Sequence, residues 1–567
     1  MRIRATTLFL ALAFGATVSG CGSDGAATSA LVAQVIPVEA VKVITDAPTL
    51  PFEGAQVIKF TVSGPGMSDV STSYDFTAGG GDLPAFPEGY ERQLTVEVCR
   101  NTCDVAAGND IISRGRSVPL TVFKGDTRTA TVFVATRNAF VPPSVIGENG
   151  TEPSVITNKY RVGATVTTLD DGRILIAGGA KIKTSATGWN RAEDLEYVTA
   201  DAEIFDPRTG TYTAVSAMNM PRAHHVAVKL GGPNRADRRV VLMGGFTTGG
   251  EITSTVELFD PDTNAFVQEP QDRSLAGAGR ALFTAALAYP DQNVVFLAGG
   301  IANPSGASGS WQLYMVGAGT VAAGALTPGP TGDQSATGTA RWNQTMTFVP
   351  AFGKDADGKD AGAFLLLGGE NNDGTVDIAE AYLVDPLNGG QFSIRRDESA
   401  TTTMPLGGRT GHSAVYVARQ GIVYVVGGFL QKGQSGPIDR IEVYRQGAKG
   451  FHKNDEGAFD EYLPMAGARG GTTATLLDPT TIFIAGGFSD SGPTSRTEVI
   501  VETVECQDAN GTPPCYRVPR LFTGRTPDMD APRAGQTAVL DSTRRLFLLG
   551  GVGDTNVTPD PILYNPE

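Results

Sequence analysis

Short apolar segments separated by polar turns recur along nearly the whole chain. Between residues 34 and 136, five segments alternate apolar and polar positions: VEAVKVI, AQVIKFTVSG, RQLTVEVC, SVPLTVF and TATVFVAT. A period of two, bounded by clusters of Gly, Pro, Asp and Ser, indicates strands with one buried and one exposed face. We therefore expect residues 34–140 to form a small antiparallel β-domain.

From residue 161 onward, one pattern recurs seven times. An apolar strand ends in a Gly-Gly doublet, at intervals of 66, 55, 69, 59, 59 and 64 residues, and an arginine opens the strand before each doublet. The doublets are Gly178 and Gly179, Gly244 and Gly245, Gly299 and Gly300, Gly368 and Gly369, Gly427 and Gly428, Gly486 and Gly487, and Gly550 and Gly551. The arginines are Arg161, Arg222, Arg280, Arg341, Arg409, Arg469 and Arg533. Because Gly takes a positive φ or a close backbone approach without cost, each doublet indicates a sharp turn after a crowded strand.

Several doublets are followed by an acidic, aromatic strand with an Asp-Pro turn: AEIFDPRTGTY, VELFDPDTNAF and AYLVDPLNGGQF, with IEVY lacking the turn. These features in phase resemble the kelch repeat, in which each unit is one four-stranded blade of a β-propeller. The resemblance covers residues 161–567 and implies seven blades, with Tyr212, Phe266 and Phe392 in place of the usual fourth-strand tryptophan. Residues 34–140 resemble an immunoglobulin-like β-sandwich, so the predicted fold class is all-β.

The last repeat stops after PILYNP, before a fourth strand. A radial sheet that is one strand short exposes an unpaired edge. We therefore expect the linker at residues 141–160, most plausibly around Ser154–Thr157, to supply the closing strand of the last blade.

The N-terminal residues 1–20 have the pattern of a secretion signal. Arg2 and Arg4 precede an apolar stretch at residues 8–18 that is too short to span a bilayer. Residues 18–21 (VSGC) resemble a bacterial lipobox, which implies that Cys21 is lipidated and that residues 21–33 form a tether. Because Gly22 rather than Asp follows, the resemblance implies the outer membrane. An ordinary signal peptide with a chance cysteine is the alternative.

The other four cysteines form two local pairs. Cys99 and Cys103 lie in CRNTC, and Cys506 and Cys515 lie in CQDANGTPPC. Each pair can close as a disulfide in an oxidising envelope. A metal site made from both pairs would require them to be adjacent in space, and they belong to different predicted domains.

Composition narrows the possible partners. The chain has 71 Gly, 34 Pro, 41% hydrophobic residues and a formal charge of −15. This much apolar content excludes a mainly disordered chain, and the acidic balance argues against binding of nucleic acid. We expect a monomer.

The kelch resemblance raises the possibility of copper, because seven-bladed kelch propellers include radical enzymes similar to galactose oxidase. That mechanism requires two His and two Tyr on copper, with a Cys joined to one Tyr. The four histidines are His224, His225, His412 and His452, and no cysteine is left over. We expect no metal and no cofactor, and we interpret His224 and His412 as structural histidines of the repeat.

The acidic loop KDADGKDAG contains Asp355, Asp357 and Asp360 and resembles part of a calcium loop. Its spacing departs from the EF-hand pattern, and no closing Glu follows. We expect a solvated hairpin, with calcium binding as the alternative.

The seven arginines are the main candidate ligand-binding residues. Their period places them at the same height near the innermost strands, where converging guanidinium groups would bind a carboxylate or an acidic peptide. In eukaryotic kelch domains, arginines at this motif position line the peptide-binding face. The other interpretation, which we favour, is that they pair with acidic residues of the third strands, such as Glu203, Glu257 and Glu442, and hold the blades together.

We find no paired acid and base, Ser-His-Asp set or phosphate loop, so no catalytic residue is assigned. The sequence favours a non-catalytic protein- or glycan-binding platform at the cell envelope. The alternative is a hydrolase or lyase that acts on an envelope polymer.

Overall fold

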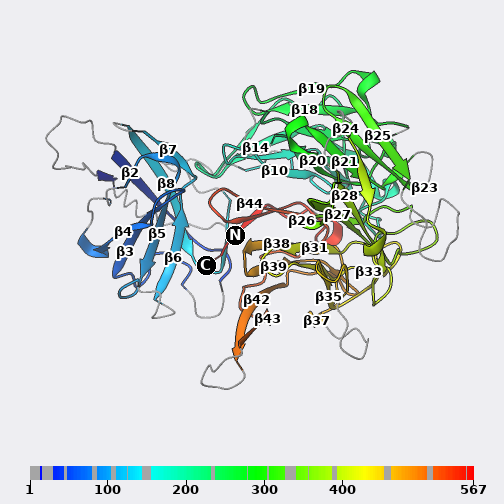
Figure 1. Ribbon diagram of the computed structural model, residues 1–567. Helices are drawn as coiled ribbons and strands as arrows, with labels where there is room; N and C mark the ends of the chain where they lie inside the picture. The colour runs from blue at the N-terminus through cyan, green and yellow to red at the C-terminus, as the bar shows by residue number, and fades with distance from the viewer. Residues whose placement is uncertain are drawn as a thin grey trace.

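The computed structural model shows an N-terminal sheet followed by a ring of seven smaller sheets (Figure 1). The residues described are 13–15, 30–43, 48–78, 83, 86–103, 110–123, 126–143, 155–156, 158–231, 237–277, 279–302, 306–325, 340–355, 357–385, 392–451, 462–506, 515–556 and 558–566. Cys21 and His452 lie outside them. Within these ranges, no helix has the length and apolarity needed to cross a membrane.

The N-terminal strands pair in the order β1-β2-β8-β6-β5-β3-β4, and β7 pairs with β5. Neighbours are antiparallel except β2 and β8, which run parallel. The strands are β1 (Ala13–Gly15), β2 (Ala30–Val38), β3 (Val57–Ser63), β4 (Val70–Asp75), β5 (Gly89–Cys99), β6 (Ile111–Arg116), β7 (Leu120–Val122) and β8 (Thr127–Thr136), with the 3-10 helix η1 at Phe76–Ala78.

Alternate side chains of these strands, including Val35, Phe60, Val96 and Val132, bury one apolar core, as the period of two predicts. The VEAVKVI segment is an exception, because β2 lies upstream of most of it and ends at Val38. The pairings give a single mixed sheet, so the immunoglobulin-like sandwich is not confirmed and stays a prediction.

Seven sheets follow, each with a path of four antiparallel strands from the ring centre outward. Blade one contains β10 (Thr165–Thr168), β11 (Ile174–Ala177), β14 (Ala202–Asp206) and β15 (Thr211–Ala214). Blade two contains β16 (Val226–Lys229), β17 (Val240–Met243), β18 (Val256–Asp260) and β19 (Ala265–Gln268). Blade three contains β20 (Thr284–Tyr289), β21 (Val294–Ala298), β24 (Ser310–Met315) and β25 (Gly319–Ala325). Blade four contains β26 (Thr345–Lys354), β27 (Asp360–Leu367), β28 (Ile378–Val384) and β29 (Ile394–Arg396).

The remaining blades complete a seven-bladed β-propeller, as the repeat predicts. Blade five contains β31 (Ser413–Val417), β32 (Ile422–Val426), β35 (Arg440–Arg445) and β36 (Gly450–Phe451). Blade six contains β38 (Thr473–Asp478), β39 (Thr481–Ala485), β42 (Thr497–Cys506) and β43 (Cys515–Thr523). Blade seven contains β44 (Thr537–Leu540), β45 (Leu546–Leu549), β46 (Ile562–Asn565) and β9 (Ala139–Val141).

Short additional elements occupy the loops. Four hairpins connect second to third strands: β12 (Ala180–Ile182) with β13 (Leu195–Val198), β22 (Ile301–Ala302) with β23 (Gly306–Ala307), β33 (Phe429–Gln431) with β34 (Ser435–Pro437), and β40 (Phe488–Ser489) with β41 (Gly492–Pro493). β30 (Thr402–Thr403) pairs with β28, and β37 (Tyr462–Pro464) pairs with β35. The other 3-10 helices are η3 (Ala192–Asp194), η4 (Thr248–Gly250), η5 (Gln271–Arg273), η6 (Pro290–Gln292), η7 (Glu398–Ala400) and η8 (Asp554–Asn556).

The second strands of the blades are mainly apolar because both of their faces are covered by neighbouring blades. Every residue of β11, β17, β21 and β45 is buried. One cluster joins Phe296 of blade three to Phe364 of blade four, with ring centroids 5.3 Å apart. The core of the propeller is therefore a series of interfaces between adjacent blades.

The ring is closed by a strand from the N-terminal part of the chain. β9 pairs with β46 in the register Val141 to Leu563 and Ala139 to Asn565. This strand precedes Arg161, as expected, but it is not the Ser154–Thr157 segment, of which residues 155 and 156 are described and belong to no strand. The reason is the tight turn at Asn138 (φ 50°), which leads directly from β8 into β9. The predicted 34–140 domain therefore contributes a propeller strand.

All fourteen doublet glycines have positive φ values, between 57° and 115°. The amide of the second glycine donates to the arginine carbonyl oxygen of the next blade, as from Gly245 to Arg280 at 2.7 Å and from Gly300 to Arg341 at 2.7 Å. A β-carbon on the first glycine would overlap that same oxygen. The doublets thus form the turn after the second strand and also allow the next blade to pack closely against it.

Candidate binding face

The two ends of the propeller differ in their residues. The doublet face carries the seven arginines, the Gly-Gly doublets and the loops between second and third strands. The turn face carries the connections between first and second strands and between third and fourth strands.

The seven arginines are at most 3% exposed. Their guanidinium groups point into the blades, where Nη1 of Arg161, Arg222 and Arg280 donates at 2.8 Å to the carbonyl of the first doublet glycine. The expected ring of guanidinium groups open to a ligand is therefore wrong, because burial removes them from solvent.

Five of these arginines form ion pairs with a glutamate of the third strand in the same blade. The pairs are Arg161–Glu203, Arg222–Glu257, Arg341–Glu380, Arg409–Glu442 and Arg469–Glu498. Burial lowers the pKa of Arg409 and raises the pKa of Glu442, and their pairing opposes both changes. These contacts match the favoured pairing with third-strand glutamates, and each pair stabilises a single blade rather than joining two blades.

Blades three and seven lack this glutamate, because Gln312 and Ile562 stand at its position. Arg280 instead bonds the hydroxyl of Ser310 at 2.8 Å, and Arg533 bonds the carbonyl oxygen of Asp560 at 2.9 Å. Burial lowers the pKa of both arginines to about 10.

The centre of the doublet face is filled by a loop of blade one. Trp189 in that loop is 6% exposed and lies 6.2 Å from Phe429 of blade five and 5.7 Å from Phe488 of blade six, measured between ring centroids. Its carbonyl oxygen is 2.8 Å from Nε2 of His224 in blade two. Contacts with blades on both sides place Trp189 across the ring axis.

Sequence analysis missed this residue, although loop length indicates it. The loop between the doublet and the third strand has 22 residues in blade one (residues 180–201). The same loop has 10 residues in blade two (residues 246–255). A loop of that length carries enough side chains to cover a ring opening.

The described histidines are hydrogen-bonded, and His225 and His412 are buried. Nε2 of His225 lies 3.0 Å from the hydroxyl of Thr165, and Nε2 of His412 lies 3.0 Å from that of Thr345. His225 is therefore the equivalent of His412, which corrects the expectation that His224 is. No group of three His, Cys, Asp or Glu side chains suited to a metal occurs among the described residues.

Two carboxyl groups in the loops of the doublet face have raised pKa values. Burial raises the pKa of Asp194 and of Glu370. Glu370 accepts hydrogen bonds from Nε1 of Trp342 at 2.9 Å and from the amide of Gly433 at 3.1 Å. Asp194 is 6% exposed and lies in η3, close to Trp189. Both groups thus belong to the packed loops around the ring centre.

An exposed aromatic pair lies at the edge of the doublet face. Tyr160 and Tyr197 are 41% and 50% exposed, with ring centroids 6.2 Å apart in an edge-on arrangement. Nζ of Lys181 lies 5.8 Å from the Tyr160 ring and 2.7 Å from a carboxylate oxygen of Glu196. This pair is a solvent-accessible apolar surface with neutralised charges beside it.

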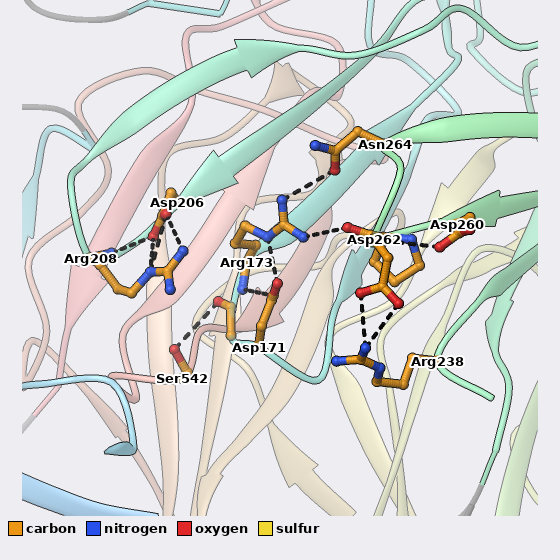
Figure 2. A network of polar contacts seen from close by, with 11 residues as sticks. Asp171, Arg173, Asp206, Arg208, Arg238, Asp260, Asp262, Asn264 and Ser542 are labelled. Atoms are coloured by element: carbon orange, nitrogen blue, oxygen red, sulfur yellow. Dashed lines mark hydrogen bonds and ion pairs between the residues drawn. The ribbon is translucent and has the colours of Figure 1, made fainter. Parts of the chain in front are cut away.

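The turn face carries a second set of arginine contacts that sequence analysis did not identify. Figure 2 shows Arg173 held by Asp171, with Nε 2.6 Å from the carboxylate. Nη2 of Arg173 donates to the carbonyl of Pro261 in the next blade at 2.8 Å, and Arg545 reaches Pro207 in the same way at 3.5 Å. Arginine side chains therefore join adjacent blades on the turn face, whereas on the doublet face they bond within their own blade.

The remaining candidates are placed as follows. The predicted disulfide between Cys99 and Cys103 is confirmed. Cys506 and Cys515 are Cα partners at the end of the β42–β43 pair, and their side chains lie outside the described residues.

The acidic loop of blade four is a hairpin between β26 and β27, as expected. Oδ1 of Asp355 accepts the amides of Asp357 and Lys359 at 2.9 and 2.8 Å. Asp360 pairs with Lys354 at 2.6 Å. These two carboxylates thus stabilise the hairpin itself.

Comparisons with known proteins add one curated relative and a structural likeness. No protein-family model matches the chain. The chain is 32% identical to human kelch-like protein 34 over 149 residues, which are 26% of this chain and 21% of that protein. The chain therefore spans about a fifth of the length of that relative.

Among solved structures, a fungal alcohol oxidase of the AA5 family, in complex with copper, overlaps 73% of this chain and 75% of its own. The identity is 14% and the TM-score is 0.45, and we draw no conclusion from this overlap. The seven sheets show a β-propeller, and the in-phase repeats and the kelch-like relative support a propeller of the kelch type.

Proposed function

We propose that this chain is a lipid-anchored monomer of the bacterial outer membrane whose propeller is a non-catalytic platform for binding a protein or a glycan. The lipobox-like residues 18–21 support the anchor, and the Cys99–Cys103 disulfide supports an oxidising compartment. The N-terminal sheet, of the expected immunoglobulin-like kind, acts as a spacer.

The exposed pair of Tyr160 and Tyr197 carries the binding proposal. Large aromatic rings bury much apolar area in a complex, and their hydroxyl groups remain available for hydrogen bonds. The nearby charges of Lys181 and Lys159 are already paired with Glu196 and Asp560. A ligand at this edge therefore meets ring faces and hydroxyl groups rather than a net charge.

The enzymatic alternative, a hydrolase or lyase, requires at least two titratable groups that converge in an open pocket. Asp194 and Glu370 have raised pKa values, but both are buried in the loops packed around Trp189. This arrangement favours binding over catalysis.

The test is a capture screen of envelope proteins and glycans with the chain from Gly22 onward. We expect the double variant Tyr160→Ala with Tyr197→Ala to weaken ligand capture by at least about tenfold, because the loss of each ring removes area that the ligand would stack on. Tyr90→Ala, at a 69% exposed tyrosine of the N-terminal sheet, is the matched control. Capture that is unchanged in the double variant would contradict the proposal.

A further inference from the structure

Positive charges gather on the face of the N-terminal sheet opposite its apolar core. Strand register places Lys59 beside Glu97 and Glu97 beside Arg114, and Arg116 lies two residues farther along β6. Because side chains alternate along a strand, Arg114 and Arg116 project from the same face. Three cations and one carboxylate therefore lie together.

That carboxylate is already engaged. Glu97 is 6% exposed, accepts a hydrogen bond from Nε of Arg114 at 3.0 Å, and lies 3.6 Å from Nζ of Lys59. Among the described residues, no acidic group forms an ion pair with Arg116. Within the described part of the chain, Arg116 therefore has no ion-pair partner of its own, and only the more distant Glu97 carboxylate, which is shared with Arg114 and Lys59, acts on its charge.

The propeller adds a further arginine at this place. Nε2 of Gln93 donates to the carbonyl oxygens of Ser117 at 2.8 Å and Ser542 at 3.1 Å, and so joins the end of β6 to the turn between β44 and β45. Arg544 lies in that turn, is exposed, and likewise forms no ion pair within the described part of the chain. Burial, followed by the charges of Arg544 and Arg114, lowers the pKa of Arg116 to about 10.

Like charges held together at a partly buried junction are unfavourable unless an anion compensates them. We propose that the junction between the N-terminal sheet and blade seven binds a multivalent oxyanion of the phosphate class between Arg116 and Arg544. Guanidinium groups match such ligands because their planar donors form paired hydrogen bonds with tetrahedral oxyanions. Arg114 adds to the local positive field. This site is separate from the aromatic pair and goes beyond the proposed platform.

The experiment is calorimetric titration of the full chain with inorganic pyrophosphate at low salt. We expect saturable binding that weakens by at least about tenfold in Arg116→Gln with Arg544→Gln, because the binding charge is removed. Arg238→Gln is the control, since Arg238 is also exposed but pairs with Asp262. No saturable binding, or equal binding by all three proteins, would overturn the site.

Thermal unfolding distinguishes an anion site from a structural role for Arg116. Without an anion, Arg116→Gln is expected to unfold at the same or a higher temperature than the parent chain, because repulsion is relieved. Pyrophosphate then stabilises the parent chain alone. A lower unfolding temperature of Arg116→Gln in anion-free buffer would contradict the proposal.

Vesicles identify the source of the phosphate group. The probe is a vesicle of phosphatidylglycerol and phosphatidylcholine. If the parent chain binds these vesicles, pyrophosphate displaces it from them, and the double variant does not bind them, the ligand is a lipid headgroup. Binding of pyrophosphate alone assigns the site to a soluble phosphate compound.

Discussion

The third residue after four of the seven repeated arginines connects a blade to the one before it. His225, Gln344, His412 and Gln536 occupy this position in blades two, four, five and seven. Each forms a hydrogen bond with a threonine hydroxyl on the first strand of the preceding blade, at 3.0, 3.4, 3.0 and 3.3 Å in that order. Gln and His therefore make the same hydrogen bond between blades, but only the His side chain can gain a proton as the pH falls.

This difference makes the stability of the ring sensitive to acid. Burial lowers the pKa of His412 to about 3. As the pH falls below about 6.5, the unfolded chain takes up a proton at this residue that the folded chain does not, so the folded state loses stability.

Replacement of His412 by Gln should reduce this loss. The parent chain is expected to lose about 2 kcal/mol more free energy of unfolding between pH 7 and pH 5 than the variant. Urea denaturation at both pH values measures the difference. An identical loss in the two proteins would show that His412 is protonated in the folded state or does not govern acid stability.

At the scale of the element, the Gly-Gly doublet ends the second strand and accommodates the next blade. Gly427 has a φ of 58°, and a β-carbon there would overlap the carbonyl oxygen of Arg469. Its conformation and its contact both exclude a side chain.

Gly427→Ala is therefore expected to destabilise the fold by about 1–2 kcal/mol from the left-handed backbone alone, with the overlap adding to this. Gly447→Ala is the matched control, because Gly447 lies in an exposed turn with nothing within 4 Å of its β-carbon position, and a change below about 0.5 kcal/mol is expected. Chemical denaturation compares the two. Equal stability of both variants would contradict the interface role.

The in-phase doublets and arginines were sufficient to predict the number of blades and the strand before each doublet. The partner of each arginine was only partly predictable, because periodicity gives the height of a residue in the ring and not the direction of its side chain. Glu203, Glu257 and Glu442 were nevertheless visible as acidic residues near the start of the third strand. β4 and β6 were missed because VSTSYD and IISRGR have few apolar positions.

At the scale of the whole molecule, the N-terminal sheet and the propeller share blade seven. Asn565 donates from Nδ2 to the carbonyl oxygens of Ala135 at 3.1 Å and Thr136 at 3.0 Å. Phe140 of β9 is fully buried, with its ring centroid 5.2 Å from that of Tyr564 and 6.3 Å from that of Phe483. A strand of three residues such as β9 carries no readable periodicity, which explains why the sequence placed it wrongly.

Phe140→Ala should destabilise the propeller as well as the N-terminal sheet, by about 3–5 kcal/mol, because it leaves a cavity between blades six and seven. Tyr90→Ala, at an exposed position of the same sheet, should change stability little. Calorimetry measures the stability of each variant, and limited proteolysis shows whether the propeller has opened. Loss of the N-terminal sheet alone would show that β9 does not hold the ring closed.

Closure by β9 also has a consequence for synthesis of the chain. Val141 and Ile562 are 421 residues apart, yet the strands they belong to are neighbours. A ribosome therefore releases one edge of the last blade long before it makes the partner for that edge. During this interval the nascent chain carries an unpaired β-edge, and contacts this distant in sequence form slowly. Completion of the ring is thereby tied to synthesis of β46, and folding helpers that shield strand edges would act on this chain before that strand exists.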